Sequence, residues 1–297
     1  MTNPPQWEPP RPEGEKPEEP QGYQPFQEYY QQPQAQAAAA QPARRSGIVG
    51  WLITAVLVVL GWAKYALVLF KAVPALGTLV SLLVSFGLYT AAFGSAWAAA
   101  GLVLMILVHE MGHVVEIRRQ GMAASAPIFI PFFGAAIFQR QHAQDPIKQA
   151  EIGIAGPIAG TLGATAAWVL YGATHQPVFL FWAWIGFYIN LFNLIPFGML
   201  DGGWILAPIS RWFQVAGLAV LAVMVFAFHF VSPILLILVI LGLPMIWQRF
   251  RNPQLDRYLT SGPAAARYGM AAAWLALVVY LGFASYEAHK VLGSLIG

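Results

Sequence analysis

The sequence contains no cysteine and very little charge. Without cysteine, disulfide bonds and thiolate metal sites are excluded, so a bound metal would depend on His, Asp and Glu side chains. Only 10% of the 297 residues are charged, whereas an ordinary soluble domain carries about 25%. The shortage of charge excludes a surface that faces water along most of the chain.

The few charges are also not arranged for nucleic acid. The formal net charge is +3, but the Lys and Arg residues stand singly or in pairs between apolar runs. Nucleic-acid-binding proteins gather such residues into a patch or stripe. Scattered basic residues between apolar runs are typical of membrane proteins, in which they set the orientation. We therefore expect a lipid bilayer around the chain and no nucleic-acid partner.

Hydrophobic residues make up 58% of the sequence and form runs long enough to cross a bilayer. The predicted spans are 76–95, 97–117, 147–172, 177–199, 213–231, 233–248 and 265–287. Segment 48–72 carries Lys64 and Lys71 on one helical face, which fits either a further span or a helix along the interface. The pattern predicts an all-α polytopic membrane protein with about six to eight transmembrane helices.

Residues 1–45 differ in composition from the rest and hold ten of the 22 prolines and six of the ten glutamates. So little apolar surface cannot offset the entropy of ordering, which predicts a disordered tail. The tail would act as a solvated tether or, alternatively, bind a partner that recognises proline-rich segments. Residues 46–297 would then form the membrane domain.

A short segment between two predicted spans does not have the pattern of a helix. Residues 125–139 are rich in β-branched and aromatic side chains, with Gly134 near the middle. This composition predicts a short β-hairpin that enters the membrane. Non-helical backbone at that depth needs neighbouring protein or a water-filled cavity.

Basic residues predict the orientation of the spans. Arg118 and Arg119 follow span 97–117, and Lys148 opens the next span. Because cytoplasmic loops carry an excess of Lys and Arg, these helix ends are expected on the cytoplasmic side. Arg211 and the arginines of 249–257 place two later connections on the same side.

Span 97–117 contains the sequence His109-Glu110-x-x-His113. Residues four apart lie on one face of a helix, so both imidazoles can converge on one Zn²⁺. Glu110 projects about 100° away from His109 and could act on a metal-bound water as a general base. Ionisable groups within a membrane span are costly and usually mark function.

A catalytic zinc site needs a third protein ligand. Glu116 lies about 10.5 Å along the helix axis from His109, too far to share one ion, so we expect it at the interface or orienting His113. Among the three aspartates, Asp201 follows a membrane span that is predicted to end on the same side as His113. Asp201 is therefore the expected ligand, and a helix-capping role remains compatible with ligation.

The two motifs together resemble the site-2 protease family of intramembrane zinc metalloproteases. The resemblance covers residues 97–206 and is carried by His109-Glu110-Met111-Gly112-His113 and by Asn193-x-x-Pro196-x-x-x-Leu200-Asp201-Gly202. Gly156-Pro157-x-x-Gly160 matches the family's small-residue segment, although close helix packing explains these glycines equally well.

The resemblance implies hydrolysis of peptide bonds in transmembrane protein substrates. One Zn²⁺ per chain would be bound by His109, His113 and Asp201, with Glu110 activating water. The hairpin would present substrate as a strand, and Asn193 would contact substrate or be interhelical glue. Candidate substrate contacts on the hairpin are Gly134, Ala135 and Ile137.

Two other functions remain open: a membrane metal transporter, and a catalytically idle scaffold. A transporter would not need Glu110 beside the metal, and an idle scaffold would not need to keep a full set of metal ligands. We expect an integral protein of the bacterial cell membrane with its active site toward the cytoplasm. The sequence indicates no oligomeric state.

Overall fold

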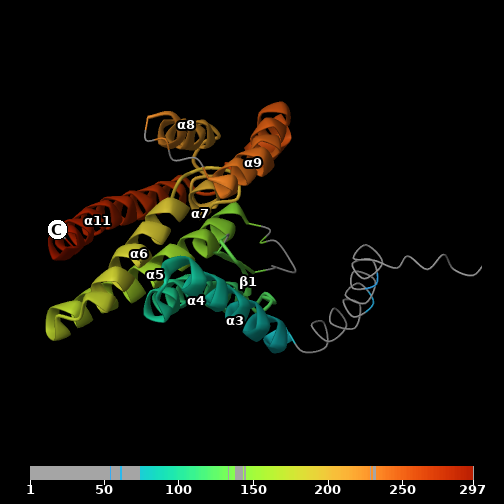
Figure 1. Cartoon of the computed structure of the whole chain (residues 1–297). Coiled ribbons are helices and arrows are strands. Elements are labelled where there is room, and N and C mark those ends of the chain that lie inside the picture. The colour runs from blue at the N-terminus through green and yellow to red at the C-terminus, as the bar shows by residue number, and fades with distance from the viewer. Residues whose placement is uncertain are drawn as a thin grey trace, which may run out of the picture. The chain divides into compact units, whose positions relative to one another are not determined.

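In the described part of the chain, the fold consists of apolar helices and one small hairpin that lies beside α3 and α4 (Figure 1). The computed structural model describes residues 74–132, 134–137, 143, 145–227, 229 and 232–296, together with Thr54 and Gly61. The predictions for the tail and, apart from these two residues, for segment 48–72 lie outside the described residues.

Four of the described helices are long and apolar enough to cross a membrane. They are α3 (Pro74–Phe93), α4 (Ala96–Arg119), α5 (Pro146–Thr174) and α11 (Ala264–Ile296). A fifth span is reached if α9 (Pro233–Arg251) is counted with α10 (Pro253–Leu259), from which it is bent by 99°. The predicted class, an all-α polytopic membrane protein, is confirmed.

Two further apolar helices are shorter. α6 (Pro177–Asn193) has 17 residues and α8 (Trp212–Phe226) has 15, so each is at most about 26 Å long against about 30 Å of hydrocarbon. The described part of the chain reaches the predicted six to eight spans if both of these helices cross as well, or if one of them crosses and α9 with α10 counts as a span.

The predicted span 177–199 is wrong in its last six residues. α6 ends at Asn193, and the chain then turns before the short helix α7 (Asp201–Ile205). Pro196 has no N–H with which to continue a helix, and Gly198 takes a left-handed φ of 50°. Residues 194–211, which we call the connector, therefore link α6 to α8 through α7.

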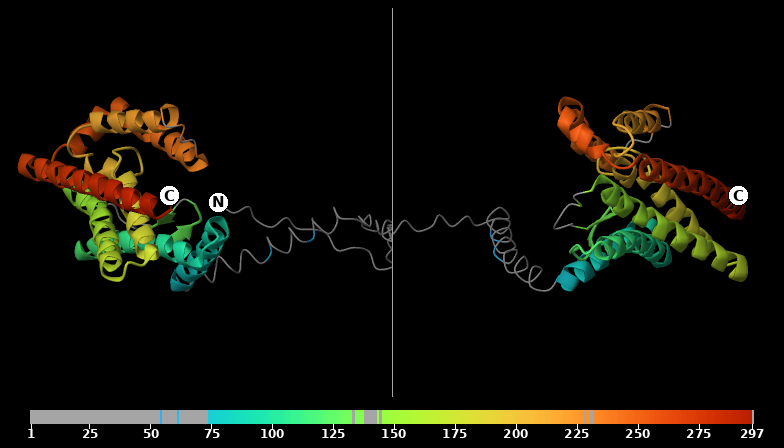
Figure 2. Two further views of the ribbon diagram at one scale, coloured as in Figure 1. Left: turned by 60° about the vertical axis from the view of Figure 1, so that its left-hand side comes forward. Right: turned by 180° about the vertical axis from the view of Figure 1, so that it is seen from behind.

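α4, α5 and α6 pack against one another and form the centre of the fold. α3 lies against α4, and α11 packs on α6 (Figures 1 and 2). Gly186 on α6 allows α4 and α5 to approach α6 closely, because a Cβ there would meet the side chains of Met105 and Ala164. The largest buried cluster includes Met105, Leu180, Phe187 and Leu281.

The predicted hairpin is confirmed as β1 (Ile128–Ile130) paired antiparallel with β2 (Gly134–Ala136). Opposite residues are Ile128 and Ala136, Phe129 and Ala135, and Ile130 and Gly134. Side chains of α3 hold the hairpin: Ser81 Oγ accepts from the Phe129 N–H at 3.0 Å, and Tyr89 Oη accepts from the Phe132 N–H at 2.8 Å.

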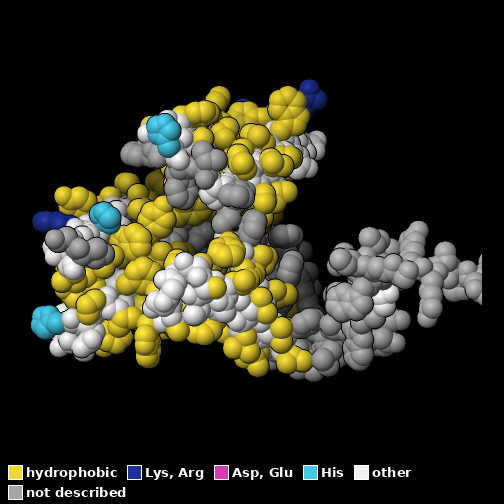
Figure 3. Space-filling view, in the orientation of Figure 1, with side chains coloured by type: hydrophobic (Ala, Val, Ile, Leu, Met, Phe, Trp, Pro, Cys, Tyr) yellow, Lys and Arg dark blue, Asp and Glu magenta, His cyan; other side chains and the backbone are white. Residues whose placement is uncertain are grey.

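The outside of the helices is hydrophobic. Figure 3 shows a face covered by apolar side chains, with basic and His side chains only near its margins. Trp97 on α4, Phe226 on α8 and Phe283 on α11 are 70%, 79% and 66% exposed. So many exposed large apolar side chains suit a surface that is covered by lipid.

Candidate metal centre

α4 directs the side chains of His109, Glu110 and His113 toward the interior of the fold and not toward its outer surface. His109 is 4% exposed and Glu110 9%. The two imidazoles are one helical turn apart, with ring centroids separated by 4.9 Å. Their Nε2 atoms are 3.2 Å apart. The predicted convergence of two imidazole nitrogens on one face of the helix is therefore present.

Asp201, the first residue of α7, meets the two imidazoles. Its Oδ2 is 3.1 Å from His109 Nε2, and its Oδ1 is 3.4 Å from His113 Nε2. The residue before it, Leu200, is the N-cap of α7, so the Asp201 carboxylate faces the histidines instead of capping the helix. Two segments far apart in the sequence thus meet at one point.

In each imidazole, the proton lies on Nδ1, the ring nitrogen that does not face Asp201. His113 Nδ1 is 2.8 Å from the Ile152 carbonyl oxygen, which can only accept, so Nδ1 carries the proton. His109 Nδ1 is 2.8 Å from Asn190 Oδ1, also an acceptor. In the neutral imidazoles, each Nε2 therefore turns a lone pair toward Asp201. In metal sites, a hydrogen bond from the ring nitrogen that does not bind the metal orients each histidine.

This donor set fits a cation. Two nitrogen lone pairs and a carboxylate converge, and Asp201 Oδ2 is buried without a hydrogen-bond donor. Zinc bonds of about 2.0–2.2 Å at tetrahedral angles place neighbouring ligand atoms about 3.3–3.6 Å apart, close to the observed 3.1–3.4 Å. Within the described residues, these three side chains form the group that could hold a metal ion.

Glu110 stands beside this group without joining it. The described part of the chain gives its carboxylate no ion pair, but Glu110 is near enough to interact electrostatically with His109, His113 and Asp201. A carboxylate in this position could exchange a proton with a molecule bound at the three ligand atoms.

Glycines on α5 leave room for the metal-site side chains. A Cβ on Gly156 would overlap the His113 imidazole, and one on Gly160 would overlap the Asn190 carboxamide. A Cβ on Gly153 would come within 3.2 Å of Trp204 on α7. Gly156 and Gly160, which were predicted to permit close helix packing, therefore also make space for the candidate site.

The backbone around Asp201 is equally crowded. A Cβ on Gly202 would overlap the Leu194 carbonyl group, and one on Gly203 would lie 2.7 Å from the Gly198 carbonyl oxygen. Trp274 on α11 donates from Nε1 to the Leu194 carbonyl at 2.8 Å. These contacts fold the connector against the end of α6 and fix the start of α7.

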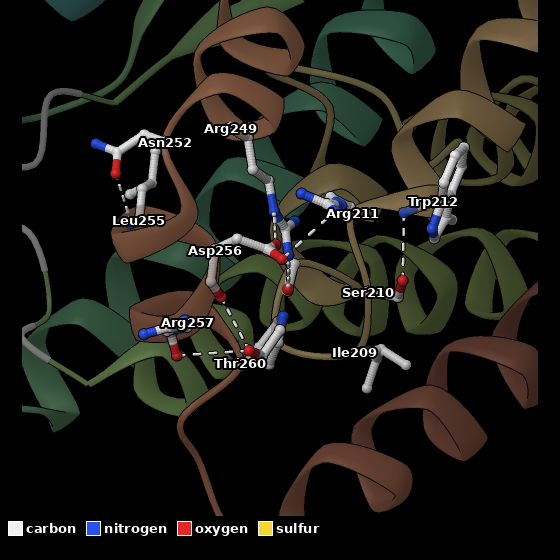
Figure 4. Close-up of polar contacts among 12 residues, drawn as sticks. Ile209, Ser210, Arg211, Trp212, Arg249, Asn252, Leu255, Asp256, Arg257 and Thr260 are labelled. Carbon is white, nitrogen blue, oxygen red and sulfur yellow. Dashed lines mark hydrogen bonds and ion pairs between the residues drawn. The ribbon is translucent and has the colours of Figure 1, made fainter.

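The far end of the connector is held by charged side chains, which Figure 4 shows in part. We call Arg211, Arg249, Asp256 and Arg267 the arginine cluster. Arg249, only 2% exposed, donates from Nε to Asp256 Oδ1 and from Nη2 to the Ala207 carbonyl, both at 2.8 Å. Arg267 donates to the carbonyls of Pro208 and Ile209. Arg211 lies 3.9 Å from Asp256.

Of the predicted substrate contacts, Asn193 and Gly134 line one cavity of about 330 Å³. This cavity lies between the hairpin and α9 and is otherwise mostly apolar, with Leu200 just before Asp201 in its wall. Ala135 belongs to β2 and packs toward the buried cluster around Phe129. Ile137 follows β2 directly and packs beside Ile117 and Ile152.

Two features of the site were not predicted. Asn190 contacts His109, although an isolated Asn in an apolar helix carries no signal that distinguishes this role from a simple helix–helix contact. Glu116 does not orient His113, because it pairs with Arg119 Nε at 2.7 Å and with Gln120. A backbone carbonyl, Ile152, orients His113 instead, and backbone partners cannot be read from residue types.

Comparison with known proteins connects this region to one family. Residues 97–177 match the sequence model of Peptidase family M50. The chain is 30% identical over 125 residues to Stage IV sporulation protein FB of Bacillus subtilis. It is 31% identical over 117 residues to Rip3 of Mycobacterium tuberculosis, whose name describes it as a candidate zinc metalloprotease.

These matches are partial on both sides. They cover 41% and 36% of this chain, and 42% of the sporulation protein and 29% of Rip3. The chain thus spans less than half the length of either relative, and the family match ends before Asp201. The match does contain His109, Glu110 and His113. The resemblance to the site-2 protease family of intramembrane zinc metalloproteases is therefore confirmed, and the region that carries it is the one that supplies these three residues.

Proposed function

We propose that this protein is an intramembrane zinc metalloprotease that hydrolyses peptide bonds of transmembrane protein substrates. The observation that carries the proposal is the convergence of two imidazole Nε2 atoms and the Asp201 carboxylate, with Glu110 beside them and outside the ligand set. This arrangement lies within helices whose outer surfaces are apolar. The family match over residues 97–177 supports the same activity.

His109, His113 and Asp201 would hold one Zn²⁺ per chain. A bound zinc ion would supply a Lewis acid for the scissile carbonyl and lower the pKa of a water molecule. Glu110 accepts the proton of the attacking water and delivers it to the leaving amine, because it lies next to the ligands without being one of them. Asn193, on the wall of the adjacent cavity, is positioned to contact substrate.

The hairpin would bind the unwound substrate as an added strand. The Phe129 N–H donates to Ser81 on α3, so the pair Phe129–Ala135 cannot be a hydrogen-bonded pair of the ladder. In an antiparallel ladder, the opposite residue then also directs its N–H and C=O away from the partner strand. Ala135 therefore presents both groups at the outer edge of β2, where β-augmentation can occur.

We also propose that the site faces the cytoplasm of a bacterial cell membrane. Arg118 and Arg119 close α4 just beyond His113, and the arginine cluster holds the connector that carries Asp201. An excess of basic residues on this side agrees with the positive-inside rule.

Glu110→Gln tests the function against its alternatives. The amide cannot take a proton, so cleavage of a model transmembrane substrate should fall at least about 100-fold, while the zinc content stays at the wild-type level. In a metal transporter the same variant would keep most of its metal flux. Membrane proteomes of cells with wild-type and variant protein would identify single-span proteins that accumulate, and the absence of any cleavage defect would refute the protease assignment.

Ala135→Pro tests the edge of the hairpin. Proline removes the outward N–H, so cleavage of a helical substrate should fall at least about tenfold, the equivalent of one hydrogen bond of about 1.4 kcal/mol. Zinc content should not change. Ala135→Ser, which keeps the N–H, is the matched control. Wild-type cleavage by the proline variant would show that the hairpin does not pair with substrate.

A further inference from the structure

Asn190 is fully buried in the centre of the fold, where α6 meets α4 and α5. Its side chain makes two contacts. Oδ1 lies 2.8 Å from His109 Nδ1, and Nδ2 donates to the Gly186 carbonyl, one turn earlier on α6, at 2.7 Å. Both ends of the carboxamide are therefore engaged.

These two contacts leave one arrangement of protons. The Gly186 carbonyl can only accept a hydrogen bond, so the NH₂ end of the carboxamide must face it. The oxygen end then faces His109, and only an N–H at Nδ1 can complete that contact. In the neutral imidazole, this proton leaves Nε2 with a free lone pair. That nitrogen is the one directed at His113 and Asp201.

Helix α5 accommodates this arrangement through Gly160. A Cβ at this position would overlap the Asn190 carboxamide. His113 reaches the same protonation through a different partner, the Ile152 carbonyl, which no substitution can remove. The orientation of His109 thus depends on a side chain, and that of His113 on the backbone.

We propose that Asn190 is a positioning residue of the metal centre, which fixes the tautomer and ring plane of His109 so that Nε2 binds zinc. Gly160 is the second part of the same device, because it provides the space that Asn190 occupies. This inference rests on the proposed zinc site, and it assigns a role to Asn190 that is separate from substrate binding.

The direct test compares zinc affinities of purified full-length protein by competition with a chelator. Asn190→Leu has a similar volume but no acceptor, so its affinity for Zn²⁺ should be about 10–100-fold weaker. The absorption spectrum of bound Co²⁺ should change with it. Asn190→Asp restores an acceptor for Nδ1 and should bind within about threefold of wild type, which a purely structural role of the amide would not predict.

Asn193→Leu is the matched control. Asn193 lies one turn further along α6 and also donates to a carbonyl four residues earlier, that of Ile189, but its position is on the substrate cavity. This variant should keep wild-type zinc affinity. Equal affinities of wild type and Asn190→Leu would overturn the inference, whereas failure of the wild type to bind more zinc than His109→Ala would overturn the proposed function instead.

Gly160→Ala gives a second route that leaves Asn190 in place. The added methyl group should displace the carboxamide and weaken zinc affinity, while Gly172→Ala on the same helix meets open space and should not. If Asn190→Leu fails to fold, the comparison of Gly160→Ala with Gly172→Ala tests the inference instead. A weaker affinity of Gly160→Ala alone supports the inference, and equal affinities of the two alanine variants overturn it.

Discussion

The connector takes part in two polar clusters that differ in how their donors and acceptors are paired. At the arginine cluster, cationic donors meet a carboxylate and three backbone carbonyls, so attractive partners face one another. At the candidate metal centre, two Nε2 lone pairs and a carboxylate face one another, and acceptor meets acceptor.

Both clusters are built from polar groups in an apolar protein. Only at the arginine cluster do protein atoms supply partners of the opposite kind, with Arg249 Nη1 as a buried donor that lacks one in the described structure. Burying a charge is costly unless it is paired, and Asp256 provides that pairing for Arg249. Among the described residues, no group of opposite charge lies between His109, His113 and Asp201. Donors that meet acceptors stabilise a fold, whereas converging acceptors indicate a cation that binds from outside.

The largest effect is expected from Asp201→Ala. Zinc should be lost, and cleavage should fall about 1000-fold or more, because the metal supplies several kcal/mol of transition-state stabilisation. Without metal, the Asp201→Ala variant should unfold at the same temperature as wild type or at a higher one, because the substitution removes an uncompensated acceptor. Metal analysis and thermal unfolding in a chelator check both parts. Full retention of tightly bound zinc would contradict the ligand assignment.

The converse is expected from Arg249→Met. The substitution leaves Asp256 without its closest cation and the Ala207 carbonyl without its donor, and breaking a buried pair costs about 3–5 kcal/mol of unfolding free energy. The loss of unfolding free energy should lie toward the lower end of this range because the Asp256 side chain is 23% exposed. Zinc affinity should change much less than in Asp201→Ala.

Arg257→Met is the control for Arg249→Met, because Arg257 is exposed on the neighbouring helix α10. Its unfolding free energy should stay within about 0.5 kcal/mol of wild type. If Arg249→Met instead unfolded like wild type and lost its zinc, the two clusters would not differ in the way described.

The smallest effect is expected from deletion of residues 1–45. The segment has the composition of a disordered tail and is far in sequence from His109 and Asp201, so zinc content should not change, and cleavage of a model transmembrane substrate should stay within about threefold. Cleavage rates of full-length and shortened protein in the same detergent give the comparison. Complete loss of cleavage with normal expression would make the tail part of the working enzyme.

The sequence predicted the meeting of α4 with Asp201 because the relevant signals are local. Two histidines four residues apart share a helix face by geometry alone, and basic residues at helix ends oriented both segments. The hairpin was predictable for a similar reason, since its β-branched and aromatic residues contrast with the helices around it. Each of these predictions depended on a few neighbouring residues.

Other features depend on how helices cross. Asn190 reaches His109 only because α4, α5 and α6 pack closely at Gly160, and no pattern within α6 contains that information. The end of α6 was predicted too late because residues 194–199 are as apolar as the helix before them. Arg249 was expected to mark a cytoplasmic connection, and nothing near it in the sequence indicated burial. The bend between α9 and α10 brings Asp256 back to Arg249 and allows its burial.

The shortness of β2 bears on which substrates the proposed pairing would favour. Of its three residues, Ala135 is the one with N–H and C=O at the outer edge, so the proposed pairing would return one N–H and one C=O contact to a bound strand. Unwinding one turn of a substrate helix breaks about three to four backbone hydrogen bonds. The edge cannot compensate for that loss, and pairing of this kind reads no side-chain identity. Selection would then fall on the fragility of the substrate: spans that already unravel near the membrane surface would be cut, and firmly wound spans of any sequence would be spared.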